Sequence, residues 1–254
     1  MILSSRNLGT GEPVIVLHGL LGNGSNWLPI ARTFEAHRRW LLPDLRNHGA
    51  SPHTDVMSLD SMADDIEHLM IEHGIASASV VGHSLGGKVA MTLALRSPQS
   101  VARLCVVDIA PVPYRNGHHE LLDTMAALDL GAVQQREDAN QQLAKHVDDP
   151  RIRAFILTNL QRTPTGFTWR VNLPALQASL TDLSGFDAEG AYDGDCVFIG
   201  GSDSDYIRDT HHTTIKGYFP RAAIDVIANA GHWPHVDQPD HFGVMLQDFL
   251  RIDT

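Results

Sequence analysis

A serine at position 84 lies between two glycines, in the pattern Gly82-His83-Ser84-Leu85-Gly86, with apolar residues on both sides. The β-branched residues before this pattern predict a buried strand, and residues 89–95 predict a helix. A serine on so tight a strand-to-helix turn projects its hydroxyl outward, and the residues two positions away must be very small. The pattern predicts a nucleophilic serine, with the N–H of Leu85 facing a developing oxyanion. The structural alternative is a glycine-rich turn with an incidental serine.

The alternation of apolar runs and amphipathic stretches predicts an α/β fold, a mainly parallel sheet with helices on both faces. Residues 112–184 depart from this alternation. They suggest short helices over 119–128, 137–147 and 151–160, with a strand at most over 167–171. We therefore predict a core domain formed by residues 1–111 and 185–254, with residues 112–184 forming a helical cap over the active-site face.

Composition argues against nucleic acid and a membrane span, and it indicates the cellular compartment. The chain has 254 residues and a net charge of −11, which argues against nucleic acid as a partner. No apolar run approaches the roughly 18 residues that a membrane span needs, and the N-terminus lacks the layout of a signal peptide. Cys105 and Cys196 lie in apolar, strand-like runs, so two buried free thiols and a cytoplasmic location are expected.

The carboxyl ends of the predicted strands carry the candidate chemistry. Residues 14–17 form an apolar run that ends in a glycine-rich loop, so the N–H of Leu20 is a candidate second oxyanion donor. An ordinary β-to-α loop is the alternative there. Polar candidates that follow other apolar runs are Ser84, Asp108, Asp203 and His232. This is the order nucleophile, acid, histidine, and the spacing leaves the choice between the two aspartates open.

On these motifs the sequence resembles the α/β-hydrolase family over nearly its whole length. The segments that carry the resemblance are the loop 18–22, the turn 82–86 and the loop 231–233. Segments that point to a narrower branch, the bacterial carboxylesterases that also act on acyl-CoA thioesters, are 43–51, 107–111 and 230–235.

The resemblance implies a serine carboxylesterase or thioesterase for short- to medium-chain acyl esters. In such an enzyme His232 takes the proton of Ser84, Leu20 and Leu85 hold the oxyanion, and water hydrolyses an acyl-enzyme. The branch implies Asp108 as the acid, whereas the position usual in the superfamily is that of Asp203. No metal or organic cofactor is expected, and the partner is a small acyl ester. The oligomeric state stays open.

Aromatic residues near the candidate loops are the expected substrate contacts. Trp27 and Trp233 flank the oxyanion loop and the histidine, and Tyr206 is a further candidate for an acyl pocket. The 15 histidines do not suggest a metal site, because no third and fourth ligand arrive at matching spacing.

Four other polar residues are interpreted as structural. Asp44 and His48 are expected to hold a loop through hydrogen bonds and to shape its turn. The ring of His83 is expected to be packed or hydrogen-bonded, and Lys88 on the helix after the nucleophile is expected to be solvated.

Alternatives from two classes of function remain at this stage, other hydrolase-fold enzymes and a receptor. A carbon–carbon bond hydrolase or a cofactor-free haloperoxidase would keep the same triad. A ligand receptor derived from a hydrolase would combine slow turnover with ligand-dependent capture of a partner.

Overall fold

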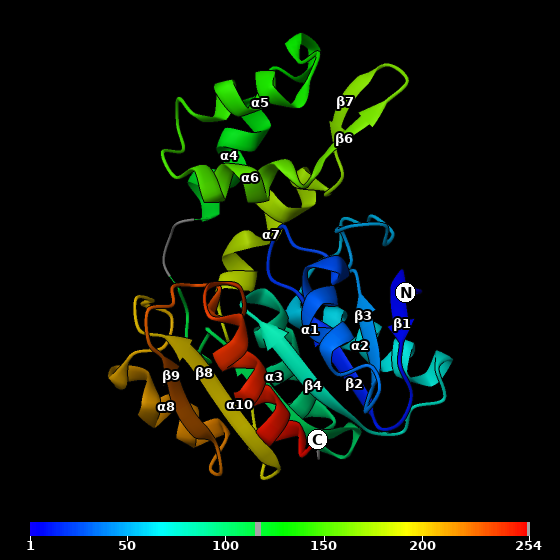
Figure 1. The fold of residues 1–254 in the computed structure, drawn as a ribbon, viewed down its shortest axis with the longest axis vertical. Coiled ribbons are helices and arrows are strands. Elements are labelled where there is room, and N and C mark those ends of the chain that lie inside the picture. Colours follow the sequence, from blue (N-terminus) through cyan, green and yellow to red (C-terminus); the bar gives the residue numbers. More distant parts are fainter. Residues whose placement is uncertain (115–117, 253–254) are drawn as a thin grey trace.

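A seven-stranded sheet forms the centre of the molecule (Figure 1). The structure is a computed structural model that describes residues 1–114 and 118–252. In spatial order the strands are β1 (Ser5–Leu8), β3 (Arg39–Pro43), β2 (Pro13–Leu17), β4 (Ala78–His83), β5 (Val101–Val107), β8 (Asp195–Gly201) and β9 (Ala223–Ile227). Strand β1 pairs antiparallel with β3, and the other pairings in this sheet are parallel.

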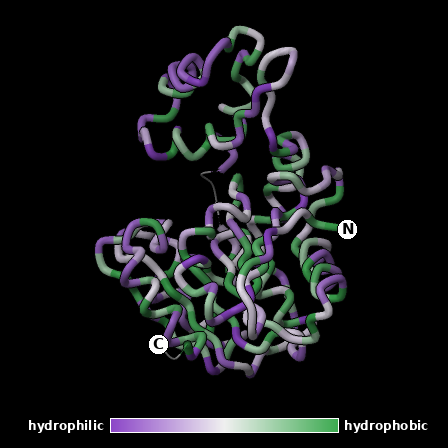
Figure 2. Tube along the Cα trace, turned by 45° about the vertical axis from the view of Figure 1, so that its right-hand side comes forward, coloured by the Kyte–Doolittle hydropathy of each residue, from purple (hydrophilic) through white to green (hydrophobic). Residues whose placement is uncertain are grey.

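The central strands are buried on both faces because alternate side chains enter two separate cores. On β2, Val14 and Val16 join one core, whereas Ile15 and Leu17 join the other. In Figure 2 many hydrophobic stretches, in green, run through the interior of the larger, lower body. Helices α1 (Leu28–Thr33) and α10 (Pro239–Leu250) cover the first face. The opposite face is covered by α2 (Leu59–Glu72), α3 (Leu85–Arg96) and α8 (His212–Tyr218).

The chain between β5 and β8 forms a separate layer above the carboxyl ends of the strands (Figure 1). Its elements are α4 (His118–Ala127), η3 (Leu130–Ala132), α5 (Arg136–Leu143), α6 (Pro150–Leu157), the hairpin β6 (Leu160–Thr163) with β7 (Gly166–Trp169), and α7 (Leu173–Ser184). Three of these helices match the predicted ones within a few residues. The hairpin corrects the expectation of a helix as far as residue 160, and α7 was not predicted.

The remaining short elements lie at the ends of strands and helices. They are η1 (Gly24–Trp27), η2 (Pro98–Ser100), η4 (Asp209–His211) and α9 (Pro234–Asp237). Asn23 and Asn26 form a capping box at the start of η1, and α1 follows it directly. Cys105 and Cys196 are free and buried, as predicted. Within the described ranges, every helix is too short or too polar to cross a membrane.

Candidate active site

Ser84 forms the turn between β4 and α3 with a strained backbone. Its φ of 51° and ψ of −118° are unusual for a residue with a side chain. A Cβ atom on Gly82 would lie 2.3 Å from the carbonyl oxygen of Gly86, and one on Gly86 would lie 2.4 Å from that of Leu17. The glycines are therefore required by close backbone contacts, which confirms the steric reason read from the sequence. Leu85 is the first residue of α3, so its N–H is free of the helix ladder.

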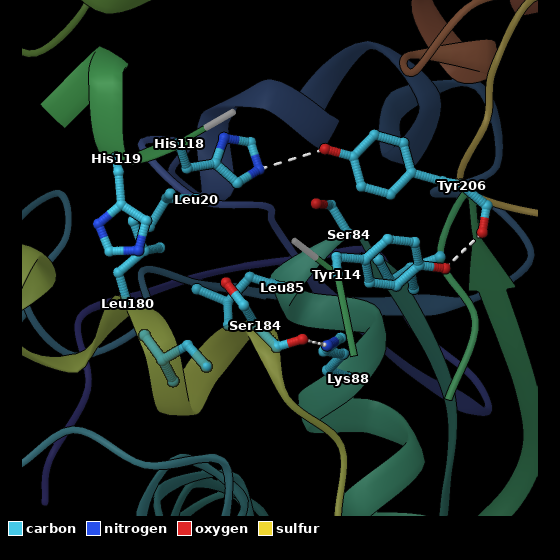
Figure 3. A pocket seen from close by; sticks show the side chains of 12 residues that line it. Leu20, Ser84, Leu85, Lys88, Tyr114, His118, His119, Leu180, Ser184 and Tyr206 are labelled. Carbon is cyan, nitrogen blue, oxygen red and sulfur yellow. Dashed lines mark hydrogen bonds between the residues drawn. The ribbon is translucent and has the colours of Figure 1, made fainter. Parts of the chain in front are cut away.

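The loop after β2 packs directly against this turn. A Cβ on Gly19 would lie 3.3 Å from Cβ of Ser84. His18 holds the loop, because its Nδ1–H donates to the carbonyl of Gly19 over 2.8 Å and its Nε2 accepts from the N–H of Leu45 over 2.9 Å. Leu20 and Leu85 line one pocket together with Ser84 (Figure 3). Both predicted oxyanion donors thus belong to residues beside the serine.

His232, on the loop after β9, contacts the aspartate that follows β5. Its Nδ1 lies 2.7 Å from Oδ2 of Asp108, which is fully buried. Because a carboxylate only accepts, Nδ1 carries the proton and the Nε2 lone pair is left free. The ring of Tyr206 stacks on His232 with centroids 4.0 Å apart, and Nε2–H of His83 donates to the His232 carbonyl over 2.7 Å. The ring orientation of His232 is thus fixed from several sides.

The second candidate acid lies elsewhere. Asp203 is exposed, and its carboxylate accepts from the hydroxyl of Ser202 over 2.9 Å. Its backbone N–H donates to the carbonyl of Ala230 over 2.9 Å, so it anchors the loop that leads to the histidine. The geometry thus favours Asp108 as the partner of His232.

Two residues that sequence reasoning did not identify also hold this arrangement. Ser204 donates its hydroxyl to Oδ2 of Asp108 over 2.5 Å. Asp237 accepts from the N–H of Gly231 over 2.9 Å and forms an ion pair with Arg151 of α6. The only sequence signal for Ser204 is its position next to the alternative acid, and Asp237 carries no motif.

A cavity of about 530 Å³ extends from the serine to the layer of inserted helices. Its lining includes Ser84, His232 and the three aromatic residues predicted as substrate contacts, Trp27, Trp233 and Tyr206. The inserted segment contributes apolar side chains, among them Leu121, Ile152 and Phe155. The serine and the histidine therefore open onto a largely apolar space that the sheet and the inserted helices enclose together.

Buried histidines surround the site in their neutral form. Burial lowers the pKa of His18 to about 4 and that of His235 to about 3. Burial, with the neighbouring His232, also holds the pKa of His83 well below its usual range. The expectation that the ring of His83 is hydrogen-bonded is confirmed. Within residues 1–114 and 118–252, no group of three or more His, Cys, Asp or Glu side chains is placed to hold a metal ion.

The remaining structural predictions have different outcomes. The carboxylate of Asp44 accepts from the N–H groups of Gly24 and Ala50, both over 2.8 Å, so it ties its loop down as expected. The prediction of a solvated Lys88 is wrong, because its side chain is 2% exposed. Lys88 turns inward to meet carbonyl groups at both ends of the inserted segment, a contact that no local pattern reveals.

Comparison with known proteins agrees with this architecture. A sequence model described as the alpha/beta hydrolase fold matches residues 12–239. An sn-1-specific diacylglycerol lipase ABHD11 of Mus musculus is 39% identical over 97% of this chain and 84% of its own length. Esterase YbfF of Escherichia coli is 31% identical over 93% of this chain and 92% of its own length. A solved structure, a marine microorganism esterase, superposes with a TM-score of 0.95 at 33% identity, covering 98% of this chain and 99% of that one.

The family match spans most of the chain, and the seven-stranded sheet with its serine turn has the arrangement that this match implies. The chain belongs to the α/β-hydrolase fold family.

Proposed function

We propose that this α/β-hydrolase is a serine carboxylesterase in which Ser84 is the nucleophile, His232 the general base and Asp108 the acid. The observation that carries the proposal is the 2.7 Å contact between His232 and buried Asp108, at a cavity that the strained serine also lines. The esterase and lipase relatives support hydrolysis of carboxylic esters as the reaction.

The reaction begins when a substrate ester carbonyl reaches Ser84. Nε2 of His232 takes the hydroxyl proton while Oγ of Ser84 forms a bond to the carbonyl carbon. The N–H groups of Leu20 and Leu85 stabilise the oxyanion, each by roughly 3 kcal/mol. The intermediate collapses, the alcohol leaves with the proton from His232, and a water molecule then releases the acid from the acyl-enzyme by the same steps in turn.

The cavity favours substrates with an apolar chain. Apolar side chains from the inserted segment and the aromatic residues Trp27, Trp233 and Tyr206 can cover a short- to medium-chain acyl group. We propose residues 112–184 as the cap that makes this part of the site. Thioesters of coenzyme A are included in the proposal, because a thioester carbonyl reacts with serine by the same route. Acylglycerols are included because the mouse relative is a diacylglycerol lipase.

Hydrolysis of p-nitrophenyl esters from acetate to laurate tests the proposal. Wild-type protein is expected to show a maximum at one chain length, and Ser84→Ala is expected to lose roughly 10⁶-fold in kcat. Thr213→Ala, a hydroxyl deletion at an exposed position of α8, is the matched control and should keep its activity. A fluorophosphonate should phosphonylate Ser84 of the wild type with loss of fluoride and the hydroxyl proton, and the mass of the phosphonyl group should be absent from Ser84→Ala.

Turnover that persists in Ser84→Ala would overthrow the mechanism. A wild type that hydrolyses no ester would favour the carbon–carbon hydrolase or the receptor instead. If esters are hydrolysed, rates for acyl-CoA and diacylglycerol, assayed in parallel, rank the ester classes.

A further inference from the structure

Lys88 is a buried cation without an acidic partner. It lies on α3 one helical turn after Ser84, and its side chain is 2% exposed. None of the ion pairs among residues 1–114 and 118–252 involves it. The other titratable side chains that line its pocket are Tyr114, His118, His119 and Tyr206. Burying an unpaired ammonium is costly, so its position calls for compensating contacts.

Three backbone carbonyls supply those contacts. The Nζ group donates to Ser184 over 2.5 Å, to Gly185 over 2.7 Å and to Val112 over 3.2 Å. The ring of Tyr114 lies beneath it, with the centroid 5.1 Å away. An ammonium has three N–H donors, and here each has an acceptor. Burial lowers the pKa of Lys88 to about 7, so the group carries its full set of donors below that pH.

The acceptors lie at the two crossings, the places where the chain passes between the sheet and the inserted segment. Val112 follows β5, where the chain leaves the sheet, and Ser184 with Gly185 ends α7, where the chain returns. The N–H of Tyr114 also donates to the carbonyl of Ser184 over 2.9 Å, which joins the two crossings directly. Figure 3 shows Lys88 reaching Ser184 below Ser84. A single side chain thus ties both crossings to the helix that carries the nucleophile.

The walls of the cavity depend on these crossings. Leu121 and Thr124 of α4, and Ile152 and Phe155 of α6, face the sheet-side residues across the cavity of about 530 Å³. The distance of these side chains from Ser84 depends on the two points at which the inserted segment joins the sheet. Substrates that reach these walls need them in place, whereas an acetyl ester reacts close to the serine.

We propose that Lys88 is a positioning residue that determines specificity, because it fastens both ends of segment 112–184 to α3 and so fixes the cavity wall that receives long acyl chains. The proposal rests on the proposed esterase function for its substrate class. Whether Lys88 fastens the two crossings can be measured without any substrate.

Lys88→Met removes the donors and keeps an unbranched side chain. Hydrogen–deuterium exchange at about pH 6 is expected to accelerate about tenfold for amides near 112–114 and 184–186, as for the loss of charge-assisted hydrogen bonds. Amides of α2 and β4 should exchange at the same rates as in the wild type. The kcat/KM for p-nitrophenyl laurate should fall about tenfold more than that for acetate, mainly through KM.

Arg96→Met is the matched control. Arg96 lies at the far end of the same helix, half-exposed and paired with Asp60 and Asp64, so its removal should change neither the exchange at the crossings nor the ratio of the two esters. If Lys88→Met does not fold, Lys88→Gln, which retains two N–H donors on a shorter side chain, is measured in its place with smaller effects in the same direction.

Unchanged exchange at both crossings would overturn the proposal. Faster exchange with an equal loss for acetate and laurate would also overturn it, since Lys88 would then support the fold without setting specificity. If the wild type hydrolyses no ester, the esterase function fails, and the exchange measurement still decides whether Lys88 fastens the crossings.

Discussion

Three donors converge on the carboxylate of Asp108. His232 and Ser204 donate to Oδ2, and the N–H of Gly201 donates to Oδ1 over 3.2 Å. The residue has a positive φ of 49°, held by its N–H bond to the carbonyl of Ile199. Such a backbone is unusual for a residue with a side chain, and it directs the carboxylate toward the loop of the histidine.

Asp108→Asn and Asp203→Asn separate the two candidate acids. Asn at 108 can present an amide N–H to His232 and favour the wrong tautomer, so kcat is expected to fall by about 10⁴-fold. Asp203→Asn changes an exposed loop anchor and should reduce kcat by less than about tenfold. The kcat of each variant is measured as ester hydrolysis at saturating substrate. Equal losses, or a larger loss in Asp203→Asn, would contradict the assignment of Asp108.

At this scale the sequence predicted the residues whose chemistry depends on a local motif. Ser84 and Leu85 were read from a turn pattern, and His232 from its place after an apolar run. Ser204 and Lys88 could not be read in this way. Both residues bond to groups more than 20 positions away in the chain, as Lys88 does to the Ser184 carbonyl. Local sequence spacing does not indicate such contacts.

Among the elements, the strand–turn–helix unit around Ser84 leaves little freedom for substitution. The backbones of β2, β4 and α3 approach one another so closely that Gly86 lies against two carbonyl oxygens, those of Leu17 at 2.4 Å and His18 at 2.6 Å from its hypothetical Cβ. Backbone atoms cannot move aside as a flexible side chain can. The turn and the loop after β2 are thus packed as one unit.

Gly86→Ala and Gly243→Ala compare this unit with an open helical site. Gly86→Ala is expected to lower the free energy of unfolding by at least about 3 kcal/mol and to displace the loop after β2. A Cβ on Gly243 in α10 meets nothing within 4 Å, so Gly243→Ala should stabilise the protein by about 0.5–1 kcal/mol. Chemical denaturation measures both. Equal stability in the two variants would show that the contacts at Gly86 relax easily.

Element prediction succeeded where periodicity was strong and failed where it was overlooked or interrupted. Helices α4, α5 and α6 each begin one residue before the predicted start. Helix α7 was missed although its buried leucines recur at helical spacing, at 173, 176, 180 and 183. The hairpin of β6 and β7 is short and half-exposed, so its residues lack the continuous apolar run that marks a core strand.

At the scale of the whole molecule, several histidines around the site are buried in their neutral form. His48 is fully buried, with its Nδ1–H donating to the carbonyl of Arg46 over 2.9 Å and its Nε2 without a partner among the described residues. Burial, reinforced by nearby His18, lowers its pKa from 6.5 to about 3. In the interval between these values the unfolded chain binds protons that the folded chain does not. The free energy of unfolding therefore falls as the pH drops below about 6.5.

His48→Asn tests this linkage. Asn keeps a donor for the carbonyl of Arg46 and cannot take up a proton. Between about pH 7 and about pH 5, the loss of unfolding free energy should be smaller than in the wild type by on the order of 2 kcal/mol. Urea denaturation at the two pH values measures it. His68→Asn, at an exposed site, should lose as much stability as the wild type. A His48→Asn variant with the wild-type dependence would refute the linkage.

The sequence by itself determined the class of fold and the serine turn. Apolar runs, their alternation with helices and the two glycines around Ser84 act through contacts between near neighbours in the chain. Only the tertiary structure decided which aspartate meets His232, which carbonyls surround Lys88, and how the inserted helices enclose a cavity of about 530 Å³. Each of these depends on distances between segments far apart in sequence, and packing of the whole chain sets those distances.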